Sequence, residues 1–363
     1  MNRYKIMNGK EKGNIKVLFL TEGKDVPASR FRVDQCIDYI EKAGIKCSVL
    51  RSWPQKYYLP GWHKKRIIGR IAVYFYFGLK VTNGLSRIMR APFYDVVFLQ
   101  RDLLSWKGSP FLECLLRKLS KKIIFDLDDA IFTNKRQKIS KLIGLSDLVI
   151  VGNSYLREYA QRYNSRVEVI PTSVDTDKYS PLTKKTGTKI IIGWMGTSSN
   201  LSNLEILSRP LSQLSEKYEF KFKVVSNFPP RVNFLNSLNI VWRRWEAKKE
   251  LEELQSFDIG VMPLVNNEWT RGKCGFKALL CMTCGIPVVI SPVGVNREIV
   301  QNGINGFLAD TEEEWIEKLS KLIDNKKLRK ELGKAARRTV VEKYSIKTNL
   351  PKVLDVFKKV RSI

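Results

Sequence analysis

Short apolar runs alternate with amphipathic segments along the first half of the chain. The runs with the length and compactness of buried parallel strands are 15–20, 46–50, 94–100, 122–130 and 148–153. Residues 31–44 have apolar positions at helical spacing and stop at Gly44. Because strands that alternate with helices form parallel sheets, this half predicts an open sheet flanked by helices.

The same alternation restarts near residue 189. Further strands are expected at 189–196, 220–226, 239–245, 257–264 and 286–292. Helices are expected between them, at 201–217, 247–256 and 273–284. A charged amphipathic segment, 312–344, and a last helix, 346–360, follow. The pattern therefore predicts an α/β protein with two doubly wound sheets.

The length and the composition suggest where the two halves divide. The chain has 363 residues, enough for two ordinary domains. Residues 173–188 are rich in Thr, Ser, Lys and Pro and lack helical periodicity, which is typical of a linker. We therefore expect one Rossmann-like domain over 1–172, a second over 189–345, and a closing helical segment over 346–363.

The charge of the chain indicates an anionic partner. Its 64 Lys and Arg against 36 Asp and Glu give a formal net charge of +28. Such an excess favours nucleic acid, an anionic membrane surface or phosphorylated substrates. The six cysteines have neither paired zinc spacing nor a dense disulfide pattern, so we expect core thiols in a reducing compartment.

No segment has the pattern of a signal peptide or of a membrane-spanning helix. The first residues are a polar lead into the strand at 15–20. The nearest candidate span, 67–81, contains Arg70 and Lys80 and is too short. We therefore expect a cytoplasmic protein.

Residues 42–94 contain no acidic side chain, and basic residues are interleaved there with aromatic ones. This mixture favours peripheral binding to an anionic membrane surface, where cations meet headgroups and rings lie at the acyl boundary. Nucleic acid is a second interpretation, but no nucleic-acid module is visible and none is expected as a partner. A third is a solvated basic face with a few core aromatics.

The turn 272–275, Gly-Lys-Cys-Gly, follows an expected strand and its loop and opens an expected helix. Ligands of open parallel sheets bind beyond the carboxyl ends of strands, where helix N-termini offer N–H groups to anions. Gly272 and Gly275 allow close backbone approach beside Cys274, and Lys273 adds a positive charge. The turn is a candidate diphosphate cradle; a surface corner is the alternative.

A second loop of the same half ends the strand at 189–196. Gly196, Thr197, Ser198 and Asn200 offer amides and hydroxyls to a phosphate or a sugar, although such residues also cap helices. After the strand at 239–245, Trp245 and Glu246 are placed to meet a nucleotide base and ribose; a core tryptophan is the alternative for Trp245.

The C-terminal half resembles the family 4, or group 1, glycosyltransferases of GT-B fold. The matching segments are FDIGVMPL (257–264), the block 275–309 and VVEKYS (340–345). The N-terminal half resembles a bacterial branch of the same family at 27–33, 123–132, 153–164 and 169–179.

The resemblance implies two Rossmann-like domains that face a central cleft. The C-terminal domain would bind a nucleotide-diphosphate sugar and the N-terminal domain the acceptor, and the last helix, 346–363, would cross back onto the first domain. It also implies transfer with retention of anomeric configuration, with no essential metal and no cofactor.

The chain departs from the family at two glutamates that usually lie eight positions apart. These positions fall on Gly272 and Leu280, and Glu268 in the preceding loop is a candidate substitute for one of them. This departure puts the donor geometry, and activity itself, in question.

The second departure concerns a histidine of the N-terminal domain, whose position here is taken by Asp128. Asp126 and Asp129 lie beside it. Close carboxylates repel one another, so one of them is a candidate proton acceptor. A bound cation is a second interpretation, and a helix cap by Asp129 a third. The only histidine of the chain, His63, lies in the basic stretch.

Two arginines follow the loop after the first strand. Arg30 and Arg32 are candidates to grip an acceptor phosphate or the donor diphosphate, since guanidinium groups match such oxygens in a fork. Solvated surface arginine is the alternative.

Together these features predict a retaining hexosyltransferase on the inner face of the cell membrane. Its acceptor would be a lipid-linked or saccharide intermediate of cell-envelope or exopolysaccharide assembly. Lys273 would stabilise the departing diphosphate, and Asp128 would orient or deprotonate the acceptor hydroxyl. The alternatives are a non-catalytic sugar-nucleotide-binding protein, a nucleic-acid-binding protein and a sugar epimerase of similar fold.

Overall fold

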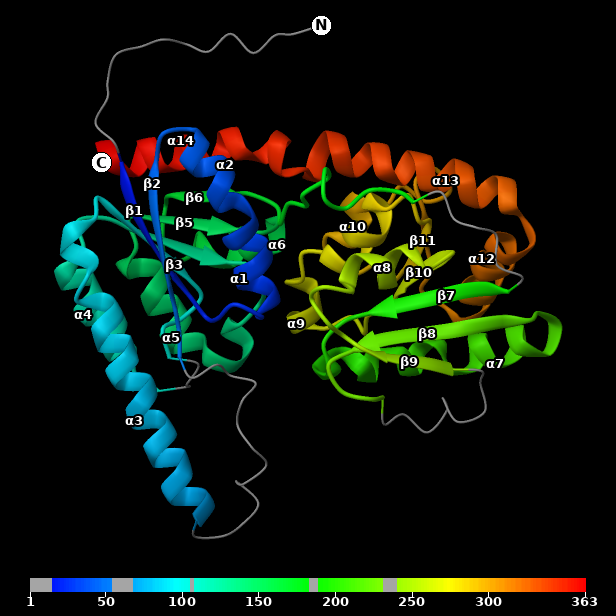
Figure 1. Cartoon of the computed structure of the whole chain (residues 1–363), viewed down its shortest axis with the longest axis horizontal. Helices are drawn as coiled ribbons and strands as arrows, with labels where there is room; N and C mark the ends of the chain where they lie inside the picture. Colours follow the sequence, from blue (N-terminus) through cyan, green and yellow to red (C-terminus); the bar gives the residue numbers. More distant parts are fainter. Residues whose placement is uncertain (1–14, 54–67, 105–107, 183–188, 231–239) are drawn as a thin grey trace, which may run out of the picture.

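The computed structural model describes residues 15–53, 68–104, 108–182, 189–230 and 240–363. Two sheets stand side by side, and a long C-terminal helical segment runs along one edge of both (Figure 1). This is the predicted fold class, because each sheet is parallel and is covered by helices on both faces.

The N-terminal sheet has the strand order β2-β1-β3-β4-β5-β6. Its strands are β1 (Lys16–Thr21), β2 (Lys46–Arg51), β3 (Val96–Gln100), β4 (Ile123–Leu127), β5 (Leu148–Val151) and β6 (Val167–Val169). In β1, Leu18 and Leu20 face one core cluster, and Val17 and Phe19 face the other. Apolar side chains on both faces of a strand explain its uninterrupted hydrophobic run.

The helices of this half are short except for α3 and α5. They are α1 (Pro27–Arg32), α2 (Ile37–Lys42), α3 (Ile68–Ile88), α4 (Phe111–Leu119), α5 (Phe132–Leu145) and α6 (Ser154–Ala160), with 3-10 turns at Asp34–Cys36 and Ala91–Phe93. Helix α3 projects beyond the sheet at its N-terminal end (Figure 1). Among the described residues, no helix has the length and apolarity that a bilayer crossing requires.

The C-terminal sheet has the strand order β12-β11-β10-β7-β8-β9. Its strands are β7 (Ile190–Met195), β8 (Phe220–Ser226), β9 (Ile240–Arg244), β10 (Ile259–Met262), β11 (Val288–Ile290) and β12 (Phe307–Leu308). Trp194 and Trp315 are fully buried on the face that α7 and α12 cover.

The helices of this half lead into the tail of the chain. They are a 3-10 helix (Ser198–Leu207), α7 (Ser208–Lys217), α8 (Glu250–Gln255), α9 (Glu268–Arg271), α10 (Phe276–Thr283), α11 (Asn296–Ile299), α12 (Glu312–Asp324), α13 (Lys326–Thr339), a π-helical turn (Val340–Tyr344) and α14 (Ile346–Ser362). Helix α13 packs on α10, whereas α14 lies over the N-terminal sheet, where Val356 and Phe357 are buried (Figure 1).

The chain passes between the halves at two adjacent places. The N–H of Val174 donates to the carbonyl of Tyr344 over 2.8 Å, and the N–H of Ile346 donates to the carbonyl of Val174 over 3.0 Å. The outgoing and returning segments are therefore hydrogen-bonded to each other where they cross.

The predictions of three helices were wrong in part, because one helix is broken and two begin later than expected. The segment 31–44 breaks at Val33, whose φ and ψ are −123° and −67°, so α1 and α2 are separate. The expected helix 201–217 begins as a 3-10 helix and becomes α-helical at Ser208. The expected helix 273–284 begins only at Phe276, because Gly275 has a left-handed φ of +63°. The short strands β6 and β12 were not predicted.

Candidate functional site

A cavity of about 560 Å³ lies between the halves, at the carboxyl ends of the strands of both sheets. Such an edge is where open parallel sheets bind ligands. Predicted site residues that line it are Arg30, Arg32, Asp128, Asp129, Gly196, Thr197, Asn200, Trp245, Lys273, Cys274 and Gly275. Ser199, rather than Ser198, lines it from the loop after β7.

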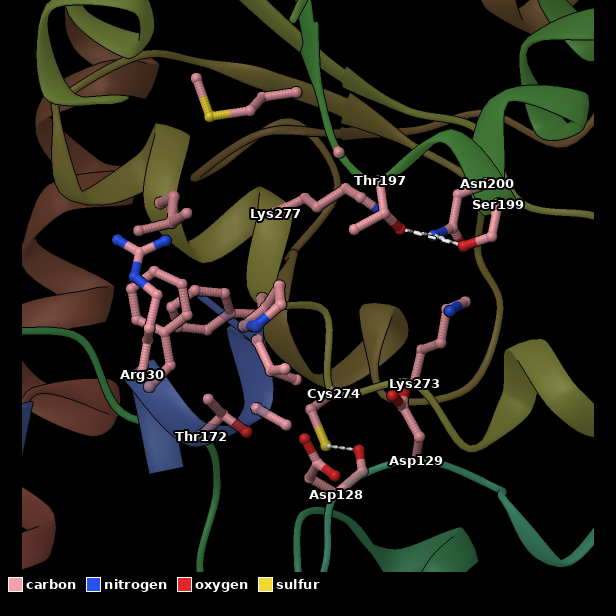
Figure 2. A pocket seen from close by; sticks show the side chains of 18 of the residues that line it. Arg30, Asp128, Asp129, Thr172, Thr197, Ser199, Asn200, Lys273, Cys274 and Lys277 are labelled. Carbon is pink, nitrogen blue, oxygen red and sulfur yellow. Dashed lines mark hydrogen bonds between the residues drawn. The ribbon is translucent and has the colours of Figure 1, made fainter. Parts of the chain in front are cut away.

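Lys273 lies in the turn between α9 and α10, and its side chain points into the cavity (Figure 2). The expectation that it opens the helix was wrong, because Gly275 is the N-cap of α10. A Cβ on Gly275 would approach Ile299 to 2.3 Å, so both its φ and its surroundings favour glycine. The Lys273 ammonium lies 5.0 Å from the Trp269 ring centre.

Across the cavity, the loop after β7 offers polar groups to a ligand. The Asn200 side-chain amide donates to the Thr197 hydroxyl over 2.8 Å, and the Thr197 and Ser199 hydroxyls are 3.0 Å apart (Figure 2). The Ser198 N–H is already taken by Asn227, which accepts from it over 2.7 Å. Thr197 and Ser199, which both carry hydroxyls, therefore line the cavity from this loop together with Gly196 and Asn200.

Lys277, in the first turn of α10, is a cavity residue that the sequence analysis missed. Burial, and with it the nearby charge of Lys273, lowers its pKa to about 7, although Asp129 opposes both effects. The apolar residues around Lys277 predicted a core helix, so Lys277 was not considered as a site residue. Its spacing of four positions from Lys273 is the signal that was available.

The floor of the N-terminal side is a carboxylate cluster organised by Arg101. Its guanidinium donates to Asp128 over 2.7 Å, to Asp129 over 2.5 Å and to Glu22 over 3.2 Å. Arg101 has a φ of +59°, a left-handed conformation that a non-glycine residue adopts at a cost. Burial raises the pKa of Asp129, and Arg101 opposes this rise.

Asp126 lies beneath this cluster and does not line the cavity. It is fully buried and forms an ion pair with Arg32, which also donates to the carbonyl of Ile170 over 2.7 Å. Burial raises the pKa of Asp126, and the charge of Arg32 opposes the rise. Arg32 touches the cavity, but its donors are committed to this internal pair.

Arg30 is likewise committed to a partner, in this case across the two halves. It donates to Glu250 over 2.9 and 2.8 Å, and Glu250 also accepts from Trp245 over 2.8 Å and from Tyr179 over 2.5 Å. These donors lower the pKa of Glu250 against the effect of burial. The sequence analysis missed Glu250; Trp245, which it placed at a nucleotide, lines the cavity and donates to this carboxylate.

The turn 272–275 also holds the two halves together. The Asn153 side-chain amide donates to the carbonyls of Gly272 and Lys273, both over 3.1 Å. The Cys274 thiol donates to the carbonyl of Asp128 over 3.0 Å, and burial raises its pKa to about 12, so it stays protonated (Figure 2). A Cβ on Gly272 would lie 2.5 Å from the Cβ of Ala130, so this glycine permits contact between the domains and does not line the cavity.

Several other predicted residues lie away from the cavity. Glu246, expected at a nucleotide, is exposed and pairs with Lys249, and Glu268, expected to substitute for a glutamate, is exposed and pairs with Arg136; neither lines the cavity. Leu280, at the second glutamate position, is buried in the cavity wall.

The basic stretch is described only in part. Residues 54–67, including His63, lie outside the described residues. On α3, Val73, Tyr74 and Phe75 are exposed, the last two by 75% and 69%. All three belong to the N-terminal half of α3, the end that projects beyond the sheet (Figure 1).

The C-terminal half matches a known family, and the whole chain matches known folds. Residues 189–325 match the family model described as glycosyl transferases group 1. Sucrose synthase of Melioribacter roseus is 37% identical over 90 residues, which are 23% of this chain and 11% of that protein. The chain therefore spans only a small part of that relative.

Two solved structures match nearly the whole chain at low identity. Sucrose-phosphate synthase from Thermosynechococcus elongatus gives a TM-score of 0.72 at 11% identity, covering 96% of this chain and 100% of that one. Anabaena HepE in complex with UDP and glucose gives a TM-score of 0.69 at 14% identity, covering 95% of this chain and 100% of that one. Both share the arrangement of two parallel sheets around a cleft. Residues 189–325 therefore resemble the group 1 glycosyltransferases, in a chain that has the GT-B fold.

Proposed function

We propose that the chain is a retaining glycosyltransferase that takes a sugar from a nucleotide-diphosphate sugar. The observation that carries the proposal is the cavity between the halves, in which Lys273 faces the hydroxyls of the loop after β7. The match of the C-terminal domain to the group 1 family model supports a sugar-nucleotide donor there. The likeness to HepE, solved with UDP and glucose, makes UDP the first nucleotide to test.

In this proposal the donor diphosphate lies against Lys273 and the loop Thr197–Asn200. The bond between the anomeric carbon and the diphosphate oxygen breaks, and the ammonium stabilises the charge that develops on that oxygen. The acceptor oxygen bonds to the same face of the sugar, so configuration is retained. The only cations invoked are those of the protein, and no metal or cofactor takes part in the proposed reaction.

Asp128 is proposed to orient the acceptor hydroxyl and to accept its proton. Its side chain is 10% exposed at the cavity, and Arg101 fixes one carboxylate oxygen at 2.7 Å. A carboxylate held this way has one oxygen directed by the protein and one left for the substrate. The bonds from Cys274 to the Asp128 carbonyl and from Asn153 to the Lys273 carbonyl join the loop of Asp128 to the turn of Lys273.

The acceptor is proposed to be a lipid-linked or saccharide intermediate of cell-envelope or exopolysaccharide assembly, met at the inner face of the cell membrane. The exposed apolar side chains of Val73, Tyr74 and Phe75 support this proposal. So does the excess of basic residues, since an anionic surface attracts cations while aromatic rings enter its boundary.

The test is a thermal-shift screen with nucleoside diphosphates and their sugars, followed by donor turnover with a membrane extract. A diphosphate that raises the melting temperature identifies the base, because a ligand that binds only the folded state stabilises it. Lys273→Ala should lose the shift and remain folded. Binding without turnover would instead support a non-catalytic sugar-nucleotide-binding protein, in keeping with Gly272 and Leu280 at the glutamate positions. Binding to oligonucleotides but to no sugar nucleotide would contradict the proposal.

A further inference from the structure

Two lysine side chains enter the cavity from one face of the turn and helix 273–283. Lys273 and Lys277 both reach toward the loop of Thr197, Ser199 and Asn200 (Figure 2). Among the described residues, neither ammonium has a hydrogen bond or an ion pair; their near neighbours are the rings of Trp269 and Trp194. Lysines at a cleft without anionic partners indicate that an anion completes the site.

The stem of Lys277 lies in a slot that leaves it little freedom. A Cβ on Gly196 would lie 2.5 Å from Cε of Lys277 and 2.8 Å from ring atoms of Trp194. The absence of a side chain at Gly196 therefore makes room for the lysine between the strand end and the tryptophan. The slot places the ammonium at the start of the loop whose hydroxyls line the cavity.

The charged groups around Lys277 do not neutralise it by contact. Lys273, in the preceding turn, repels it, and Asp129, after β4, attracts it. The Asp129 carboxylate, however, forms its ion pair with Arg101, after β3, and Asp128 does the same. Because these carboxylates are paired with Arg101, a diphosphate in the cavity would supply the negative charge that Lys277 lacks.

We propose that Lys277 is a second cation for the donor diphosphate, beside Lys273, and that it takes up a proton when the diphosphate binds. The inference rests on the proposed function and adds to it a residue and a pH dependence. Two adjacent ammonium groups match the charge of a diphosphate, but without ligand they repel each other. Binding therefore favours the doubly protonated pair.

The direction of the pH dependence follows from linkage. The pKa of Lys277 is about 7 in the unliganded protein, and a bound anion raises it. Affinity should therefore be full below pH about 7 and fall above it, by up to about tenfold per pH unit, until the pKa of the complex is reached. A terminal phosphate, with a second pKa of about 6, is already ionised in this range and adds no slope.

The experiment is calorimetric titration of the wild-type chain with UDP, GDP, ADP and dTDP at pH 7, 8 and 9, in two buffers of different ionisation enthalpy. When a diphosphate binds at pH 8, the protein should take up a fraction of a proton. The affinity for that diphosphate should fall several-fold toward pH 9. Lys277→Met should bind about tenfold or more weakly and show neither effect. Lys273→Met should bind weakly too but keep proton uptake.

Controls separate the lysine from general damage to the fold. Lys330→Met, on the exposed face of α13, should behave as wild type. Gly196→Ala keeps both charges but fills the slot, and it should weaken binding as Lys277→Met does. Wild-type binding without proton uptake and without pH dependence would overturn this inference and leave the proposed function standing. Failure of all four diphosphates to bind wild type would overturn both.

Discussion

The Arg30 guanidinium and the Glu250 carboxylate form a two-pronged ion pair between the halves of the molecule, with N–O distances of 2.9 and 2.8 Å. Their side chains are 14% and 4% exposed. Tyr179 and Trp245 complete the hydrogen bonds of the carboxylate. The pair thus joins α1 to α8 at the rim of the cavity and sets how far apart the two sheet edges lie.

Arg30→Met should destabilise the protein by ~3 kcal/mol, because it leaves the Glu250 charge buried without its cation. The measurement is urea unfolding followed by circular dichroism. Arg51→Met is the matched control: it removes an ion pair with Asp34 in which Arg51 is 38% exposed, and it should cost less than ~1 kcal/mol. Equal effects of the two substitutions would mean that the inter-domain pair is no more important than a surface pair.

The same carboxylate should make stability depend on acid pH. Its donors lower the pKa of Glu250 in the folded protein, so its contribution is present above the unfolded pKa of about 4.3 and is lost as pH falls through the folded value. Unfolding free energies measured from pH 6 to 3 should fall, and Glu250→Gln should flatten part of that fall. An unchanged profile in Glu250→Gln would assign the acid sensitivity to other carboxylates.

Gly152→Ala should disturb the contact between the halves, because its Cβ would lie 2.1 Å from the Cys274 sulfur. Overpacking of this kind costs about 1–3 kcal/mol. Removing the sulfur should relieve it, so Gly152→Ala combined with Cys274→Ala should be more stable than Gly152→Ala alone. A double-mutant cycle on thermal unfolding measures this coupling. Additive effects would show that the two residues are not in contact in solution.

Arg101 should matter for catalysis as well as for the fold. Arg101→Met leaves Asp128 and Asp129 without their guanidinium, and donor turnover should fall on the order of 100-fold. Arg101→Gly should lose as much activity, yet be more stable than Arg101→Met by about 1 kcal/mol, since glycine relieves the left-handed φ. Asp128→Asn should retain diphosphate binding and lose turnover. Full activity in either Arg101 variant would contradict the role given to this cluster.

The exposed apolar side chains of α3 should contribute to membrane binding. Tyr74→Ser with Phe75→Ser should weaken binding to vesicles containing phosphatidylglycerol by about tenfold or more, because two exposed rings no longer enter the interface. Co-sedimentation measures this. Leu182→Ser, which removes an exposed apolar side chain elsewhere, is the control. If the α3 variant binds as wild type does, these two rings do not contact the membrane, and any membrane contact must come from the basic residues.

Periodicity located the strands well, since uninterrupted apolar runs such as Val96–Gln100 become strands with both faces buried. It could not find the break at Val33 or the delay of α10 to Phe276, because both depend on single backbone dihedral angles. Strand ends also indicated which loops meet at the cavity, and so placed Lys273, Thr197 and Asp128 there.

The ion-pair partners of the charged residues could not be predicted from the sequence. Arg30 and Glu250 are 220 positions apart, and Arg32 and Asp126 are 94 apart. No local spacing relates such pairs, so Arg30 and Arg32 looked available for a ligand although carboxylates hold both. Lys277 was hidden for the opposite reason: its neighbours along the chain are apolar, and only the fold shows that its amine leaves them for the cavity.

The hydrogen bonds between Val174 and the segment Tyr344–Ile346 tie together the two places where the chain passes from one half to the other. Two tied crossings act as a single hinge line. A movement of the halves that keeps both bonds is a rotation about that line, and to open the rim it has to break the Arg30–Glu250 pair and the bonds of Asn153 and Cys274 between the halves.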